Sequence, residues 1–321
     1  MTRQVENRTV EQDEGMSRLD RWFRRHFPHI NHVQLEKLLR SGQVRVDGKR
    51  MKAADRIYPG QVVRVPPLPD AAPPKLRNKV PDRLVKDLLS RVIYKDEDVL
   101  VLNKPFGLAV QGGTGTEVHL DAALDELRFG NKERPKLVHR LDKDTAGVLV
   151  LGRTPEATRK LAESFRLHRA RKYYWAVSLG RPEMKQGRID AALAKSAGSF
   201  EKMEMNEEEG REAVTYYSIV QSAGKIASWL ALWPVTGRTH QLRAHLALIG
   251  TPILGDPKYG KKDDFGLPKK LHLFARRLIL PHPRKGKLDV TAPLPDHFKP
   301  AFAHFGFEGQ SDDDPFRDLD P

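Results

Sequence analysis

The sequence predicts an α+β protein: a large domain built on a mixed, mainly antiparallel β-sheet, preceded by a small α/β domain. Short apolar and β-branched runs, typical of strands, alternate with amphipathic segments typical of helices. A proline-rich stretch, residues 67–84, separates a basic N-terminal part from the longer remainder, as a semi-rigid linker does. At 321 residues the chain has room for about two domains, at roughly 100–200 residues each.

The composition restricts the class of protein. The chain carries 56 lysines and arginines against 42 acidic residues, and this formal net charge of +14 indicates a polyanionic partner, with nucleic acid ahead of a membrane surface. No apolar run approaches the ~18 residues of a membrane span, and residues 1–15 resemble neither a secretory signal nor a transit peptide. The absence of cysteine excludes disulfides and thiolate metal sites. We therefore expect a soluble, cytoplasmic protein that faces RNA or DNA.

The small domain is predicted over residues 16–66, after a polar, disordered segment at 1–15. A capping box at Ser17–Asp20 begins the first helix. A second helix begins near Asn31, with Gln34 three residues on, and ends at Gly42. The positions that we expect to be buried on these helices are Leu19, Trp22, Phe23, Val33, Leu38 and Leu39.

Short strands complete this domain, at 44–46 and at 57–65 with a break at Pro59–Gly60. Between Met16 and Pro66 there are 12 lysines and arginines and 4 acidic residues, a local net charge of +8. More than half of the excess charge thus lies on about a sixth of the chain. Its position on the polar faces of two helices and a hairpin favours a phosphate-contacting surface over an ordinary solvated one.

The large domain is predicted over residues 85–305, followed by an acidic tail at 306–321. Thr154 is expected to cap a helix with proline at its first position, and Thr239 to cap another. Residues 183–210 are polar and indicate a hairpin or a surface excursion. The expected strands are 92–94, 99–102, 148–151, 172–179, 212–220 and 229–234, and a further helix is expected at 119–129.

Two stretches could carry chemistry. Arg140 and Asp142 lie in a charged loop before the buried strand at 148–151, but two such residues usually form a local ion pair. In the second, a turn at 236–238 precedes a helix carrying Arg243, which is placed to pair with a carboxylate from another segment. His240 and His245 are five positions apart and do not share a helix face, so a zinc site is not expected. The stretch 255–262 fails as a phosphate loop because lysine occupies the position of the metal-binding hydroxyl.

Four segments, in order, resemble the RluA/RluC/RluD family of pseudouridine synthases. They are H-R-L-D-K-D-T-A-G-V-L-V-L from His139, K-Y-Y-W-A-V-S-L-G from Lys172, P-V-T-G-R-T-H-Q-L-R-A-H-L-A-L-I-G-T-P-I-L-G-D-P-K-Y-G from Pro234, and L-H-L-F-A-R-R-L-I-L-P-H-P from Leu271. Departures are small, such as Ala146 where serine is common. The N-terminal segments R-L-D-R-W-F-R-R, Q-L-E-K-L-L-R-S-G-Q-V-R-V-D-G-K-R and A-D-R-I-Y-P-G-Q-V-V-R-V resemble the S-four-type RNA-binding module.

The resemblance implies the pseudouridine synthase fold and isomerisation of specific uridines in large-subunit (23S) ribosomal RNA by a monomer. Transfer RNA is the alternative substrate, and a non-catalytic RNA-binding assembly factor is the alternative function. By the same resemblance, Asp142 is the catalytic carboxylate, Arg243 the cation beside it, and Tyr174 lines the base pocket. Arg140 fills the gap left by the base or holds the RNA backbone. The isomerisation consumes no redox equivalent and no nucleotide, so neither a cofactor nor a metal is expected.

Overall fold

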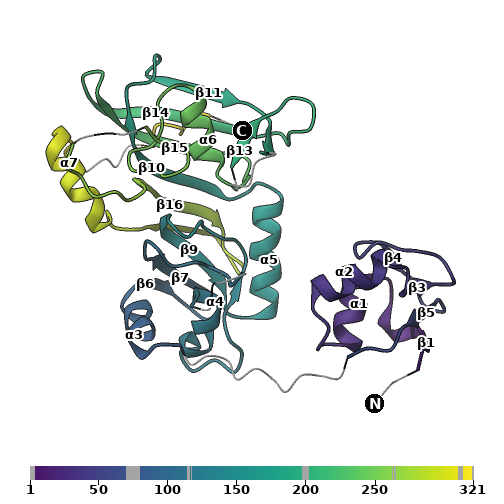
Figure 1. Ribbon diagram of the computed structural model, residues 1–321. Coiled ribbons are helices and arrows are strands. Elements are labelled where there is room, and N and C mark those ends of the chain that lie inside the picture. Colours follow the sequence, from purple (N-terminus) through teal and green to yellow (C-terminus); the bar gives the residue numbers. More distant parts are fainter. Residues whose placement is uncertain are drawn as a thin grey trace. The chain divides into compact units, whose positions relative to one another are not determined.

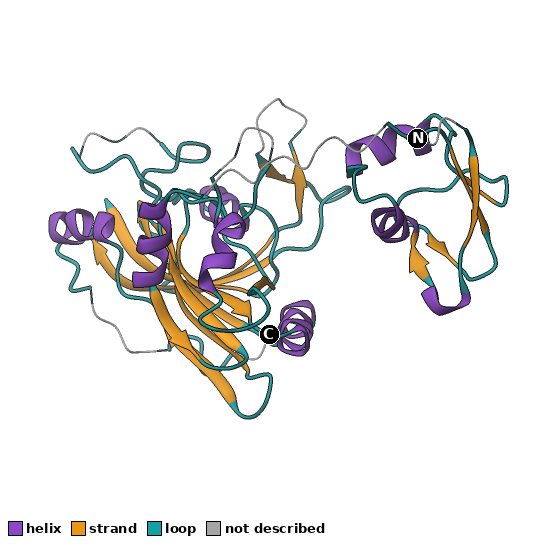
Figure 2. Cartoon of the chain, turned by 90° about the horizontal axis from the view of Figure 1, so that it is seen from below, coloured by secondary structure: helices purple, strands orange, loops and turns teal. Residues whose placement is uncertain are grey.

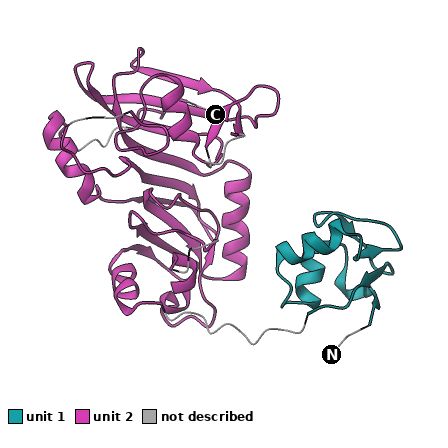
Figure 3. Cartoon of the chain, viewed as in Figure 1, with its two compact units in different colours: residues 1–78 teal, residues 79–321 magenta. Residues whose placement is uncertain are grey.

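The computed structural model describes the chain except residues 1–3, 70–79, 114–115, 117, 197–201, 262, 264, 310–313 and 320–321. It divides into two compact units, Met1–Asn78 and Lys79–Pro321 (Figure 3). Most of the linker predicted at 67–84 lies outside the described residues. The large unit begins before residue 85, because α3 (Asp82–Ser90) buries Leu88 in its core. No helix in the described part of the chain is long and apolar enough to cross a membrane.

Unit 1 (residues 1–78) packs two helices against short strands. Its elements are β1 (Glu6–Thr9), η1 (Gln12–Glu14), β2 (Ser17–Arg18), α1 (Leu19–His26), α2 (His32–Arg40), β3 (Arg45–Val46), β4 (Arg56–Ile57) and β5 (Val62–Val65). Strands β1, β5 and β3 form one antiparallel sheet, and β2 pairs with β4. Trp22, Phe23, Leu35 and Val63 form the centre of the core, each at most 3% exposed. The predicted small α/β domain is confirmed.

The prediction of disorder at residues 1–15 is wrong for Glu6–Glu14. Strand β1 pairs with β5, and Val10 is buried beside it. The Glu14 carboxylate accepts a hydrogen bond from Trp22 Nε1 (3.0 Å) and lies 2.5 Å from His26 Nε2. A polar edge strand satisfies its backbone by pairing with a distant strand, which its own composition does not reveal.

The two helix starts differ in how well the sequence predicted them. At α2, Asn31 and Gln34 form the expected reciprocal capping box, with both hydrogen bonds at 2.9 Å. The predicted box at Ser17–Asp20 is wrong, because Ser17 belongs to β2 and α1 has no side-chain cap. Burial of Val33 is also wrong: it is 77% exposed, because it lies about 200° around the helix from the buried Leu35.

Unit 2 (residues 79–321) is built on a ten-stranded sheet in the order β11-β14-β15-β10-β16-β9-β7-β6, with β17 beside β16 and β8 beside β9. The strands are β6 (Val92–Lys95), β7 (Val99–Lys104), β8 (Lys136–Leu137), β9 (Ala146–Gly152), β10 (Arg171–Leu179), β11 (Gln186–Asp190), β14 (Val214–Ala223), β15 (Ala227–Pro234), β16 (Leu273–Pro281) and β17 (Lys287–Thr291). They form one twisted layer (Figure 2). The pair β16–β9 is parallel and the other described pairs are antiparallel, so the predicted mixed, mainly antiparallel sheet is confirmed.

Helices and a small hairpin accompany this sheet. They are α4 (Leu120–Ala123), η2 (Leu124–Leu127), α5 (Pro155–Arg166), α6 (Gln241–Leu248), η3 (Asp296–Phe298), α7 (Lys299–Phe305) and the hairpin β12 (Leu193–Lys195) with β13 (Met203–Met205). Helix α5 lies along β9 and β16 (Figure 1). It begins as predicted, with Thr154 Oγ1 accepting from Ala157 N at 3.1 Å and proline at the first position.

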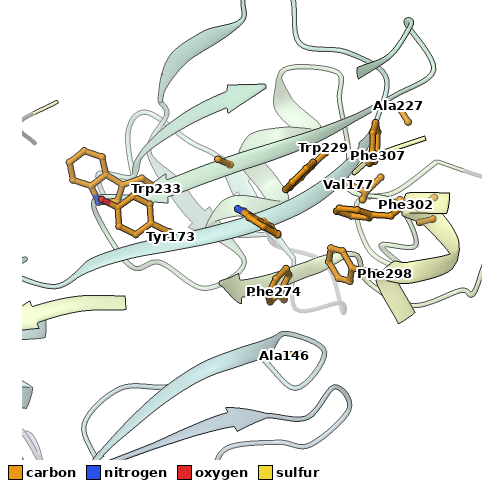
Figure 4. Packing of buried hydrophobic residues seen from close by; sticks show 14 of the residues in the cluster. Ala146, Tyr173, Val177, Ala227, Trp229, Trp233, Phe274, Phe298, Phe302 and Phe307 are labelled. Carbon is orange, nitrogen blue, oxygen red and sulfur yellow. The ribbon is translucent and has the colours of Figure 1, made fainter. Parts of the chain in front are cut away.

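Aromatic side chains fill the core beside η3 and α7. Trp229, Phe274 and Phe298 are each 0% exposed. Trp229 and Phe298 contact Phe302, and Phe274 contacts Phe298 (Figure 4). Trp175 meets Trp229 edge to face, with ring centroids 4.5 Å apart. This packing holds together the neighbouring strands β10, β15 and β16.

The parallel pair positions the loop before β9. Gly147 pairs with Ala275 of β16, which in turn pairs with Tyr174 of β10. Gly147 has φ +110°, and a Cβ there would lie 2.1 Å from the Ala275 carbonyl oxygen, so only glycine permits this approach. The start of β9 and Tyr174 are thereby brought to within two strands of each other.

The acidic segment predicted as a tail is partly packed onto the sheet. Phe316 is 0% exposed, and its ring centroid lies 6.2 Å from that of Tyr173. The Tyr173 hydroxyl donates to Asp314 at 2.8 Å. An apolar side chain within an acidic stretch is enough to dock residues 314–319, so for them the term tail is wrong.

Candidate active site

A cavity of about 400 Å³ lies where the loop before β9, the end of α5, β10 and the turn before α6 meet. Arg140, Asp142, Tyr174 and Arg243, the four residues predicted from the sequence, all line it. They come from three segments that are distant in the sequence. The fold therefore brings together every predicted site residue.

The loop carrying Asp142 is fixed through its backbone. Lys104 is 0% exposed, and its ammonium donates to the carbonyl oxygens of Pro105 (3.0 Å), Leu108 (2.7 Å) and Lys143 (3.0 Å). Thr145 N donates to the Asp142 carbonyl at 3.1 Å. No side chain in the described part of the chain hydrogen-bonds or ion-pairs with the Asp142 carboxylate, so a rigid loop presents an acid that is available to a ligand.

Arg243 pairs with Asp256 instead of Asp142. Its Nε and Nη2 donate to the two carboxylate oxygens of Asp256, both at 2.7 Å, and the two side chains are 3% and 0% exposed. Asp256 is thus the carboxylate from another segment with which this arginine was expected to pair, and no hydrogen bond joins Arg243 to Asp142 in the described part of the chain. Burial opposes the charge of Arg243, but the hydrogen bond and charge of Asp256, with a smaller contribution from Asp142, keep its pKa above its ordinary value.

Tyr174 is a hydrogen-bond donor at any physiological pH. Burial, and then the nearby charge of Asp142, raise the pKa of its hydroxyl above the ordinary value. Leu242 and Leu273 line the same cavity and are 6% and 3% exposed. The cavity thus joins a carboxylate, a phenol and a guanidinium to an apolar wall that could receive a flat ring.

The turn before α6 is locked by Gln241. Its side-chain oxygen accepts from Thr236 Oγ1 (2.7 Å) and Arg238 N (3.0 Å), and its Nε2 donates to Val214 O (2.9 Å). The helix is preceded by His240 in the left-handed region, with φ 52°, so the predicted cap at Thr239 is wrong. Gln241 and His240 both line the cavity. Sequence reasoning did not assign them to the site, although both lie within the third matching segment.

His240 belongs to a network around Tyr259. The Tyr259 hydroxyl accepts from Met203 N (2.7 Å) and lies within hydrogen-bond distance of His240 Nδ1, at 3.2 Å. The Arg243 guanidinium lies over the Tyr259 ring, 5.3 Å from its centroid. Burial lowers the pKa of His240, although the charge of Asp142 acts in the opposite direction. The ring is held neutral beside the cavity.

The motifs rejected as metal or phosphate sites have structural roles. Both ring nitrogens of His245 are engaged, with Thr215 Oγ1 (3.0 Å) and Ala191 O (3.1 Å). Within the described residues, no group of three or more histidine, cysteine or acidic side chains could hold a metal ion. Within the stretch rejected as a phosphate loop, residues 255–260 form a tight turn that supplies Asp256, and a Cβ on Gly255 would lie 2.1 Å from the Lys270 carbonyl oxygen.

Comparisons with known proteins agree with this site. The family model described as RNA pseudouridylate synthase matches residues 98–248, which include Asp142, Tyr174 and Arg243. The chain is 36% identical over 289 residues to ribosomal large subunit pseudouridine synthase C of Rickettsia bellii, covering 88% of this chain and 96% of that protein. The chain belongs to the RNA pseudouridylate synthase family. The predicted family is confirmed.

Other members of the RNA pseudouridylate synthase family extend the likeness. The Vibrio cholerae protein of the same name is 33% identical over 312 residues, with 93% of this chain and 96% of that protein covered. The solved structure of Human RNA Pseudouridylate Synthase Domain Containing 4 is 29% identical, with a TM-score of 0.60 over 70% of this chain and 96% of that chain. As a member of this family, the chain is an isomerase with an RNA substrate.

Proposed function

We propose that this RNA pseudouridylate synthase converts specific uridines of large-subunit ribosomal RNA to pseudouridine. Relatives at 33–36% identity named ribosomal large subunit pseudouridine synthase C support this substrate. The observation that carries the proposal is the setting of Asp142. It is the one carboxylate among the described cavity-lining residues, which otherwise include Arg140, Lys172 and Arg243. That arrangement suits an anionic substrate and a single reactive acid.

The reaction breaks the bond between uracil and ribose, rotates the base and rejoins it through carbon 5. Asp142 acts as the nucleophile or assists cleavage of the glycosidic bond. Arg243, held rigid by Asp256, supplies a fixed positive charge to the cavity that also contains Asp142. Tyr174 stacks on the base, and its protonated hydroxyl is available for a later proton transfer.

The uridine must first leave its stack, which costs a few kcal/mol. Arg140 is exposed at the cavity, where it can fill the gap or hold the backbone. In unit 1, the arginines and lysines on the polar faces of α1 and α2 provide an RNA-binding surface; those exposed are Arg21, Arg24, Arg25, Lys37 and Arg40. We propose that residues 16–66 form an S-four-type RNA-binding module. We also propose that the protein acts as a monomer in the cytoplasm.

The test is Asp142→Asn. A strain lacking this gene, complemented with the wild type or with D142N, is mapped for pseudouridine across its RNA. We expect D142N to lose pseudouridine formation by at least about 10³-fold while RNA affinity stays nearly constant. Asp144→Asn is the matched control, because Asp144 lies two residues on in the same loop and does not line the cavity. Full activity of D142N would contradict the proposal.

Two alternatives give distinct outcomes. If the lost pseudouridines map to transfer RNA, the large-subunit assignment is wrong and the chemistry stands. If the chain is a non-catalytic assembly factor, deletion of residues 1–66 removes nearly all function. A synthase with that deletion should keep some turnover on short RNA fragments, with weaker binding and a less steep salt dependence.

A further inference from the structure

One wall of the cavity contains two hydrogen-bond donors that the proposed chemistry does not use. Lys172 lies on β10, two residues before Tyr174, and His139 lies three residues before Asp142. Both line the cavity.

Lys172 is a mostly buried ammonium group that forms one hydrogen bond among the described residues. Its Nζ donates to the Thr236 carbonyl oxygen at 3.2 Å, and a Cβ on Gly237 would lie 3.8 Å from it. In the part of the chain that the structure describes, no carboxylate forms an ion pair with it. Burial lowers its pKa to about 8, so the amine still carries its proton at neutral pH. Of its three N–H groups, at least one remains to bind a ligand.

His139 is a neutral ring in a fixed orientation. Val150 N–H donates to its Nε2 at 2.9 Å, so a neutral ring must carry its proton on Nδ1. Phe165 stacks on the ring, with centroids 4.3 Å apart and planes at 19°. Burial, and then the charge of Lys172, lower the pKa of the ring to about 3, so it stays neutral at all working pH values. Among the described residues Nδ1–H has no acceptor, which leaves it for a ligand.

Lys172 offers a ligand a charged N–H group and His139 offers a neutral one, and a phosphate oxygen accepts a stronger hydrogen bond from a charged donor than a neutral uracil carbonyl does. The anions that RNA brings into such a cavity are its phosphates. We propose that Lys172 and His139 form a subsite for the phosphate adjoining the target uridine. This inference rests on the proposed function. By binding this phosphate, the subsite fixes the position of the attached sugar of the extruded nucleotide, and with it the position of the base relative to Asp142.

The experiment measures binding alone, on the full-length protein. Uridine, uridine 5′-monophosphate, uridine 3′-monophosphate and inorganic phosphate are titrated in turn and followed by NMR. We expect one of the two monophosphates to bind at least about 10-fold more tightly than uridine. The monophosphate that gains affinity identifies whether the 5′ or the 3′ phosphate occupies the subsite.

Two variants separate the donors. Lys172→Met should reduce the affinity of the preferred monophosphate to about that of uridine and leave uridine unchanged. His139→Gln keeps an acceptor for Val150 N–H, because the glutamine oxygen takes the position of Nε2, and it loses the Nδ1–H donor together with the ring stacked on Phe165. It should weaken the same monophosphate and leave uridine binding unchanged, and a melting curve shows separately what the lost stacking costs. Lys172→Arg, which keeps the charge, should retain the preference.

The matched control is Lys143→Met, which removes an exposed positive charge beside Asp142 but outside the cavity lining. It should bind all four probes as the wild type does. Equal or unmeasurable binding of uridine and both monophosphates by the wild type overturns the subsite, as does an undiminished preference in both K172M and H139Q. The proposed function is judged separately from pseudouridine formation by the wild type, so either idea can fail alone.

Discussion

Replacing Asp256 with asparagine should strongly destabilise unit 2, because it leaves the Arg243 guanidinium buried without a counter-charge. The Asp256 carboxylate accepts four hydrogen bonds: two from Arg243 at 2.7 Å, and one each from the backbone N–H of Lys258 (2.8 Å) and Tyr259 (3.0 Å). An asparagine keeps one oxygen, but its amide turns a donor toward a guanidinium N–H. Breaking a buried pair in this way costs about 3–5 kcal/mol.

The expected change is measurable by thermal denaturation of the full-length protein. At about 2–4 °C per kcal/mol for a domain of this size, D256N should melt about 10 °C below the wild type. Burial acts to raise the pKa of Asp256, but the hydrogen bond and charge of Arg243 hold it below its ordinary value. A carboxyl group with a lowered pKa stabilises the fold above its unfolded pKa and loses this effect as the pH falls through its folded pKa. The difference between D256N and the wild type should therefore be full at neutral pH and shrink in acid, below about pH 4.

The chain contains a matched control for burial. Arg277 and Asp289 form the same two-bond arrangement, at 2.7 Å and 2.7 Å, but their side chains are 33% and 26% exposed. Asp289→Asn should cost less than about 1 kcal/mol, because water replaces the lost partner. If D256N melts within about 2 °C of D289N, the assignment of a dry, structurally essential pair beneath the cavity is wrong.

Three further predictions concern the buried charges of Lys104 and Glu14. Lys104→Met should lower turnover more than RNA affinity, because it frees the Lys143 carbonyl next to Asp142; equal losses in kcat and in RNA binding would contradict this. Burial lowers the pKa of Lys104 to about 7, so above that pH the protein takes up a proton when it unfolds. The free energy of unfolding of the wild type should therefore rise from pH 7 toward 10, and it should rise less steeply with pH in the methionine variant. In unit 1, Glu14→Gln should cost about 3 kcal/mol at neutral pH. Burial opposes the Glu14 charge, but the Glu11 N–H, His26 and Trp22 lower its pKa to about 2, so the cost should disappear as the pH falls from 4.5 to 2; a pH-independent difference in unfolding free energy would refute it.

Local patterns in the sequence were sufficient for many elements. The apolar run at 148–151 is the centre of β9, which is buried throughout, and the aromatic stretch at 172–179 is β10. Asn31 and Thr154 cap the helices that their spacing predicts. Such features depend on neighbours within a few residues, so periodicity and capping chemistry determine them.

Other features depend on contacts between distant segments. Strand β1 forms by pairing with β5. Phe316 is held in its position by ring contacts with Tyr173 and Trp233. The prediction that Val33 of α2 is buried was wrong because the strands, and not the helix itself, determine which face of α2 meets the core. Hydrophobicity alone does not tell which face of a short helix meets the rest of the fold.

For the site, the sequence by itself determined the chemical groups: a carboxylate at Asp142, a phenol at Tyr174 and a guanidinium at Arg243, in segments typical of one enzyme family. Only the tertiary structure decided how they are arranged. The register through Gly147, Ala275 and Tyr174 brings Asp142 to the cavity that Tyr174 also lines, and Asp256, not Asp142, accepts both hydrogen bonds from Arg243. The physical reason is that pairing of strands and burial of charges are long-range choices. Strand pairing depends on which backbone segments approach closely, and the burial of a charge depends on which side chains lose their contact with water. The local spacing of residues in the sequence determines neither.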